Sequence, residues 1–107
     1  MMNIKGVRVL KSDDYDLFIE VKLDNGEYIF CNDSISNYKK IEKIEEANDE
    51  DFVVTNKSIM DVVEDEEKYE LMMKEFKKYK IEIKDVEKYN SYLNILLKVK
   101  ATLFKWS

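Results

Sequence analysis

The chain has no histidine and no proline, and it contains one cysteine and two glycines among its 107 residues. The absence of histidine excludes a Ser-His-Asp triad, a Cys-His dyad and a zinc site with histidine ligands. A single cysteine excludes an internal disulfide and a cysteine-rich metal site. Two isolated glycines can form neither a Walker phosphate loop nor a dinucleotide-binding fingerprint. The composition therefore lacks the motifs of the commonest catalytic and cofactor sites, and we expect no cofactor and no metal.

Long apolar runs are also missing from the sequence. No run approaches the ~18 residues of a membrane span, and the first ten residues lack the apolar core of a signal peptide. Hydrophobic residues make up 45% and charged residues 38%, which is typical of a folded chain. Together with the single free thiol, these features predict a cytoplasmic protein with one domain over residues 1–107 and no membrane contact.

The first third of the chain is predicted to form strands. Apolar residues alternate with Phe18, Glu20 and Lys22 over residues 17–23, the pattern of a strand with one buried face, so Glu20 is expected on a solvated face. The following Asn25-Gly26 pair favours a two-residue hairpin turn, which places Tyr28 opposite Leu23. An earlier strand is expected over residues 4–11. The predicted core face of the hairpin consists of Leu17, Ile19, Val21, Leu23, Tyr28 and Phe30.

Helices are predicted after the strands. Asp33 or Ser34 can cap a first helix, and Ser58 with Asp61 resembles the start of a second. Residues 52–54 are ambiguous and could form a fourth, edge strand, and residues 79–83 could be a connector or a strand. The clearest helix spans residues 85–106. The sequence therefore predicts an α+β fold, with a three-stranded antiparallel meander followed by three or four helices, the last of them long.

The C-terminal helix carries two apolar stripes. Their combined arc of roughly 200° is wider than one core-facing stripe requires. Either the helix is buried on both stripes, or the second stripe contacts a partner, which includes a second copy of the chain. The second stripe, the candidate oligomer face, consists of Tyr92, Ile95, Val99 and Trp106.

Charge is unevenly distributed along the chain. Residues 42–70 hold 12 acidic and 3 basic groups, a net charge of −9, whereas residues 71–107 hold 9 basic and 4 acidic groups, a net charge of +5. Carboxylates spaced along a helix resemble a phosphate strand and can occupy a Lys/Arg-lined groove built for nucleic acid. Alternatively, the acids form a solvated face that pairs with the basic third. The candidate partner-binding acids are Glu46, Asp49, Glu50, Asp51, Glu64, Asp65, Glu66 and Glu67.

Other chemistry is weakly supported by the sequence. Glu20-Val21-Lys22 has the order of a metal-dependent nuclease motif, but four acid-x-Lys triplets are about what chance gives in so charged a chain. Cys31 lacks a nearby base and is expected to act as a small apolar filler. The net charge of −5 disfavours direct nucleic-acid binding by the basic third.

The arrangement of elements resembles that of small acidic anti-CRISPR proteins from phages. The matching features are the hairpin at residues 24–28, the capped helix after it and the segment Glu64-Asp65-Glu66-Glu67-Lys68-Tyr69. The resemblance implies a non-enzymatic inhibitor that presents carboxylates to the basic nucleic-acid-binding surface of a target protein. The alternative is a small oligomerising regulatory or structural module that acts through its apolar C-terminal helix, for example as a homodimer. A metal-dependent nuclease-like enzyme is the third possibility.

Overall fold

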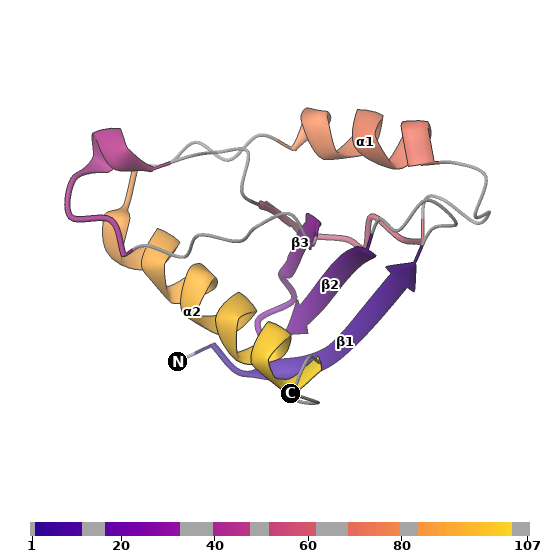
Figure 1. Cartoon of the computed structure of the whole chain (residues 1–107), viewed down its shortest axis with the longest axis horizontal. Helices are drawn as coiled ribbons and strands as arrows, with labels where there is room; N and C mark the ends of the chain where they lie inside the picture. Colours follow the sequence, from indigo (N-terminus) through magenta and orange to yellow (C-terminus); the bar gives the residue numbers. More distant parts are fainter. Residues whose placement is uncertain are drawn as a thin grey trace.

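A computed structural model describes residues 2–11, 17–32, 40–47, 52–61, 69–79 and 84–103. These residues form an α+β fold, as the sequence predicted (Figure 1). The elements in chain order are β1 (Ile4–Lys11), β2 (Leu17–Leu23), β3 (Tyr28–Asn32), the 3₁₀ turn η1 (Ile44–Glu46), β4 (Val53–Thr55), α1 (Tyr69–Lys78) and α2 (Val86–Leu103).

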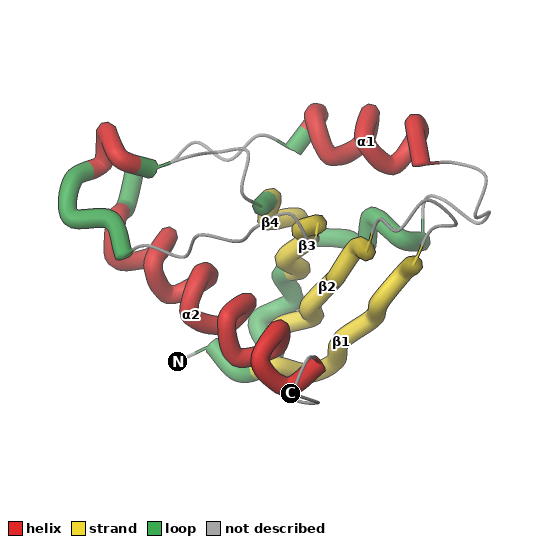
Figure 2. Tube along the Cα trace, viewed as in Figure 1, coloured by secondary structure: helices red, strands yellow, loops and turns green. Residues whose placement is uncertain are grey.

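The four strands form one antiparallel sheet in the order β1-β2-β3-β4. The meander of β1 to β3 agrees with the prediction, and β4 extends it by a fourth strand that pairs Val53 with Phe30. The fourth, edge strand that the sequence allowed at residues 52–54 is therefore present, and it spans Val53–Thr55. Figure 2 shows β4 at the opposite edge of the sheet from β1.

The predicted register of the β2–β3 hairpin is wrong by one residue. Lys22 pairs with Tyr28, and Val21 pairs with Ile29. The turn has three residues instead of two: the Gly26 N–H donates to the Leu23 carbonyl, and the Leu23 N–H donates to the Glu27 carbonyl. Gly26 has a φ of 89°, the left-handed conformation that closes a three-residue hairpin loop with a bulge. Because alternate residues face opposite sides of a strand, the slip moves Tyr28 and Phe30 to the other face.

Both faces of the sheet are covered by apolar side chains. One cluster joins β2 and β3 to α2, and its sheet residues are Ile19, Val21, Leu23, Ile29 and Cys31. The second cluster lies on the opposite face and contains Phe18, Phe30, Val53 and Ile59, with Phe76 of α1 packed against it. The helices α1 and α2 therefore lie on opposite sides of the sheet, and the buried Cys31 fills space in the larger core.

Helix α2 begins beside Asp85, whose carboxylate accepts a hydrogen bond from the Lys88 N–H at 3.1 Å. It ends at Leu103 in the described part of the chain, and residues 104–107 lie outside that part. Its buried residues include Tyr92 and Val99 of the second predicted stripe, whereas Leu97 and Leu103 are 37% exposed. The buried residues of α2 are Tyr89, Tyr92, Leu93, Leu96 and Val99.

The number of helices differs from the prediction. The described residues contain two α-helices and one 3₁₀ turn, where three or four helices were expected. Residues 33–39 of the helix expected to begin at Asp33 or Ser34 lie outside the described part. Of the residues expected to continue it, Ile41 lies in neither a helix nor a strand, and Ile44 belongs to η1. Residues 58–61 form a bend and a turn instead of a helix start, and residues 62–68 and 80–83 are outside the described part. Within the described ranges, neither helix combines the length and the apolar character that crossing a bilayer requires.

Candidate functional site

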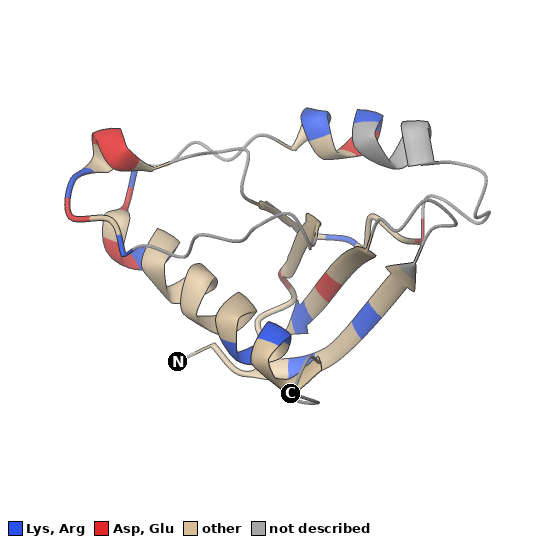
Figure 3. Ribbon diagram, viewed as in Figure 1, with Lys and Arg blue, Asp and Glu red and all other residues tan. Residues whose placement is uncertain are grey.

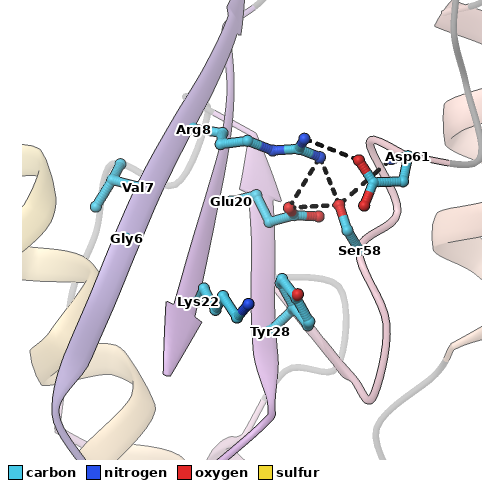
Figure 4. Close-up of a pocket in the computed structure, with 8 residues that line it drawn as sticks. All are labelled: Gly6, Val7, Arg8, Glu20, Lys22, Tyr28, Ser58 and Asp61. Carbon is cyan, nitrogen blue, oxygen red and sulfur yellow. Dashed lines mark hydrogen bonds and ion pairs between the residues drawn. The ribbon is translucent and has the colours of Figure 1, made fainter. Parts of the chain in front are cut away.

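A cluster of four polar side chains joins β1, β2 and the loop after β4. In the β1–β2 register, Arg8 lies directly opposite Glu20. The Arg8 guanidinium is 3.3 Å from a Glu20 carboxylate oxygen and 2.8 Å from an Asp61 carboxylate oxygen. It also donates to the Ser58 hydroxyl at 2.5 Å (Figure 4). This Arg8 cluster thus consists of Arg8, Glu20, Ser58 and Asp61, drawn from segments far apart in the sequence.

Glu20 is the buried centre of the Arg8 cluster, with 2% of its surface exposed. Its carboxylate accepts hydrogen bonds from the Ser58 hydroxyl at 2.6 Å, the Ile59 N–H at 2.9 Å and, at 3.4 Å, the Met60 N–H. The expectation that Glu20 lies on a solvated strand face is therefore wrong. The loop at residues 58–61 folds over this face of β2 and uses the carboxylate as its hydrogen-bond acceptor.

A pocket of about 340 Å³ opens beside the Arg8 cluster. Gly6 lies opposite Lys22 in the register, and a Cβ at Gly6 would meet no atom within 4 Å, so the missing side chain leaves the pocket open. The Lys22 ammonium lies 5.6 Å from the centre of the Tyr28 ring. No ion pair involves Lys22 in the part of the chain that the structure describes. Figure 4 shows Lys22 and Tyr28 on one side of the pocket and the Arg8 cluster on the other.

The hydrogen bonding of the Arg8 cluster indicates a structural role. The Ser58 hydroxyl donates to Glu20 and accepts from Arg8 and from the Asp61 N–H, so it has no free position at which to act as a nucleophile. Burial lowers the pKa of the Arg8 guanidinium, but its hydrogen bonds and charge contacts with Asp61 and Glu20 raise that pKa overall. The cluster fixes the loop to the sheet and holds a permanent cation at the edge of the pocket. Among the described residues, no group of three or more potential ligands could hold a metal ion.

The acids proposed from the sequence are only partly visible. Glu46 lies in η1 and is exposed, as are Glu42 and Glu45 beside it. Figure 3 shows the red of acidic residues on this segment of the ribbon. The remaining candidate acids lie outside the described residues; they are Asp49, Glu50, Asp51, Glu64, Asp65, Glu66 and Glu67. The described part of the site is thus the short acidic segment at residues 42–46.

The candidate oligomer face is not a continuous exposed surface. Tyr92 and Val99 are each only 4% exposed because they pack in the core between α2 and the sheet. Burial raises the pKa of Tyr92, and so does Glu27, which accepts a hydrogen bond from the Tyr92 hydroxyl at 2.9 Å. Ile95 is partly buried against the same core, and Trp106 lies outside the described residues. Contact of Tyr92 or Val99 with a partner would require α2 to leave the sheet.

Sequence reasoning missed the Arg8 cluster and the pocket next to it. A signal was present: Arg8 is the single arginine, and the Ser58–Asp61 spacing had been interpreted as a helix cap. The register of β1 on β2 would have placed Arg8 opposite Glu20, but no turn sequence between those strands specifies it. The position of the loop over the sheet could not be predicted from local pattern.

Comparisons with known proteins identify no relative. No family model matches the chain, and neither the curated proteins nor the solved structures contain a match. Any functional conclusion therefore depends on the residues of this chain.

Proposed function

We propose that this protein is a non-enzymatic binding module that inhibits a nucleic-acid-handling protein. In this proposal its carboxylates occupy a basic surface of the target that normally holds DNA or RNA, as in the phage and mobile-element inhibitors of the anti-CRISPR kind. The proposed site of action is cytoplasmic. The observation that carries the proposal is that Glu42, Glu45 and Glu46 are exposed and form no ion pair with any other described residue.

In the described part of the basic third, no lysine forms an ion pair with these three carboxylates. The ion pairs of the described residues join Arg8 to Glu20, Arg8 to Asp61, and Lys78 to Glu75, and none includes Glu42, Glu45 or Glu46. Within the described residues, this observation favours the interpretation in which the acidic segment does not pair with the C-terminal lysines. Its charge remains available to a partner.

The backbone also holds this acidic segment in place. The Glu42 N–H donates to the Glu46 carboxylate at 3.1 Å. Just before it, Asn90 of α2 accepts a hydrogen bond from the Ile41 N–H and donates to the Ile41 carbonyl, both at 3.1 Å. Because Ile41 is buried in the core, the acids that follow it are anchored to the fold. A fixed set of charges loses less conformational entropy on binding than a free segment does.

The test is salt-dependent capture of a target. The full chain is immobilised, lysate of the host is passed over it, and salt is raised from about 0.1 M to about 1 M while the eluted proteins are identified. We expect a nucleic-acid-binding protein that is released by salt and displaced by added DNA or RNA.

Charge reversal within the acidic segment tests whether this segment is responsible for the binding. Glu45→Lys and Glu46→Lys should each weaken capture, and the double variant should abolish it. Glu87→Lys is the matched control, because Glu87 is also exposed and lies in α2, outside the acidic segment. Equal capture by wild type and the double variant, or loss of capture with Glu87→Lys alone, would overturn the assignment.

A further inference from the structure

The sheet has two edges of very different character. The edge strand β4 has three residues, and its outer members Val53 and Thr55 are 1% and 5% exposed. The edge strand β1 has eight residues, and no described strand or loop pairs with its outer side. An open edge of this length offers a row of unpaired backbone N–H and C=O groups to another chain.

The two faces of β1 also differ. On the side of α2, Ile4, Val7 and Val9 are between 39% and 44% exposed, although they lie beside the fully buried face of β2. Among the described residues, the core cluster under α2 includes residues of β2 and β3 but none of β1, so the apolar face of β1 is only partly covered there. An added strand with apolar side chains on this face would extend the core by one strand.

The opposite face of β1 borders the pocket. Gly6 has no side chain, so a side chain from an added strand could pass over it into the pocket between Arg8 and Lys22 (Figure 4). Lys22 lies two strand spacings, about 9.6 Å, from such a strand, a span that extended glutamate and lysine side chains can bridge together. The two carboxylates of the pocket lining, Glu20 and Asp61, are both paired with Arg8. Among the described residues, the Lys22 ammonium has no ion pair and lies near the Tyr28 ring, so it can bind a carboxylate of the added strand.

Charge argues against a second copy of this chain as the occupant. Strand β1 carries Lys5, Arg8 and Lys11 and no acidic residue. In an antiparallel β1–β1 pair, the register that places Val7 opposite Val9 of the second copy also places Arg8 opposite the same residue of the second copy. Like charges directly opposite each other destabilise a strand pair. A strand with acidic residues is attracted to the cations of β1, whereas the cations of a second copy are repelled by them.

From these observations we infer that the outer edge of β1 binds an extended segment of a partner protein as a fifth strand. Residues of this segment alternate between apolar side chains, which cover Val7 and Val9, and aspartate or glutamate, which enter the pocket over Gly6. Backbone hydrogen bonds supply part of the affinity, and the alternating side chains supply the specificity. This inference does not depend on the acidic segment at residues 42–46, which lies far from β1 in Figure 1.

A random peptide library tests the inference directly. Twelve-residue peptides displayed on phage are selected on the immobilised full chain, and enriched peptides are synthesised and their Kd measured by fluorescence anisotropy. We expect enriched peptides to alternate acidic and apolar residues. Their affinity should fall about ten-fold on Lys22→Glu. It should stay within about two-fold of wild type on Lys74→Glu, a control that reverses an exposed lysine of α1, and on Glu46→Lys.

Amide hydrogen exchange locates the bound peptide. In a strand pair, every second residue directs its N–H to a given neighbour, so binding at the edge should slow exchange at alternate amides of β1. No enrichment, enriched peptides without alternation, or protection outside β1 would each overturn the inference. It would also fail if the chain alone self-associated with increasing concentration and showed the same β1 protection without peptide.

Discussion

Glu20 provides the sharpest test of how the fold is held together. Its carboxylate is almost fully buried and accepts hydrogen bonds from the Ser58 hydroxyl and the Ile59 N–H. It also forms an ion pair with Arg8. Glu20→Ala removes the acceptor of all three groups. Arg8 can turn to water because half of its side chain is already exposed, but Ile59 is buried and its N–H donates to the Glu20 carboxylate.

The expected loss follows from these contacts. A hydrogen bond to a charged acceptor is worth about 1.5–3 kcal/mol, and two short ones are lost. The ion pair with the half-exposed Arg8 adds at most about 1 kcal/mol after screening. Water entering from the adjacent pocket recovers part of the loss, so we expect Glu20→Ala to lower the free energy of unfolding by about 3 kcal/mol. Glu20→Gln keeps one acceptor oxygen and should cost about 2 kcal/mol.

Urea unfolding followed by circular dichroism measures this loss. With an m-value of about 1.5 kcal/mol per M, a loss of 3 kcal/mol moves the midpoint by about 2 M. The matched control is Glu45→Gln, an exposed acid with no ion pair among the described residues, which should change stability by less than about 0.5 kcal/mol. The double variant Arg8→Met, Glu20→Leu should not restore stability, because the Ile59 N–H stays unsatisfied. A midpoint shift below about 0.5 M for Glu20→Ala would refute this account of the cluster.

Three further predictions concern the hairpin, a helix cap and a buried phenol. Gly26→Ala should cost about 1 kcal/mol because of its φ of 89°, whereas Gly6→Ala, at an open position without positive φ, should be close to neutral; thermal unfolding of both distinguishes them. Asp85→Ala should cost about 1 kcal/mol and Asp85→Ser much less, since serine can still accept the Lys88 N–H; equal losses in urea unfolding would contradict the capping role. For Tyr92, a folded-state pKa raised above the unfolded value of about 10 means that its stabilisation is present below that pH and is lost as pH rises through the folded pKa. Tyr92→Phe should therefore flatten the fall of stability with pH above about 10, and an unchanged pH profile would exclude this role.

The elements that could be predicted from the sequence are those with the clearest local pattern of apolar residues. The alternation in residues 17–23 predicted β2 and its apolar face, and the long apolar pattern with Asp85 at its start predicted α2. The hairpin register failed because Asn25-Gly26 fits both a two-residue turn and a three-residue turn with Gly26 left-handed. Packing decides between them: the observed register places Ile29 and Cys31, instead of Tyr28 and Phe30, in the core with α2.

The candidate site was harder to predict because it depends on contacts distant in sequence. Nothing near Glu20 indicates burial, since its acceptors are filled by a loop about 40 residues later. The acidic segment was visible from composition alone, but the contact with Asn90 that holds it beside α2 depends on three-dimensional positions. The two apolar stripes of α2 were visible too, yet only the packed sheet shows that Tyr92 and Val99 face inward.

The two proposed surfaces have opposite charge, so one copy's acidic segment could in principle bind the β1 edge of another. The structure argues against this contact. An occupant of the edge must be extended, with every second side chain on each face. The acidic segment instead contains the 3₁₀ turn Ile44–Glu46, and Ile41 before it is buried and held by Asn90 on both its N–H and its carbonyl. Straightening this segment would remove Ile41 from the core, which an electrostatic gain of about 1 kcal/mol per exposed ion pair does not offset. The two proposals therefore remain separate, one for a basic partner and one for a partner with a strand of alternating acidic and apolar residues.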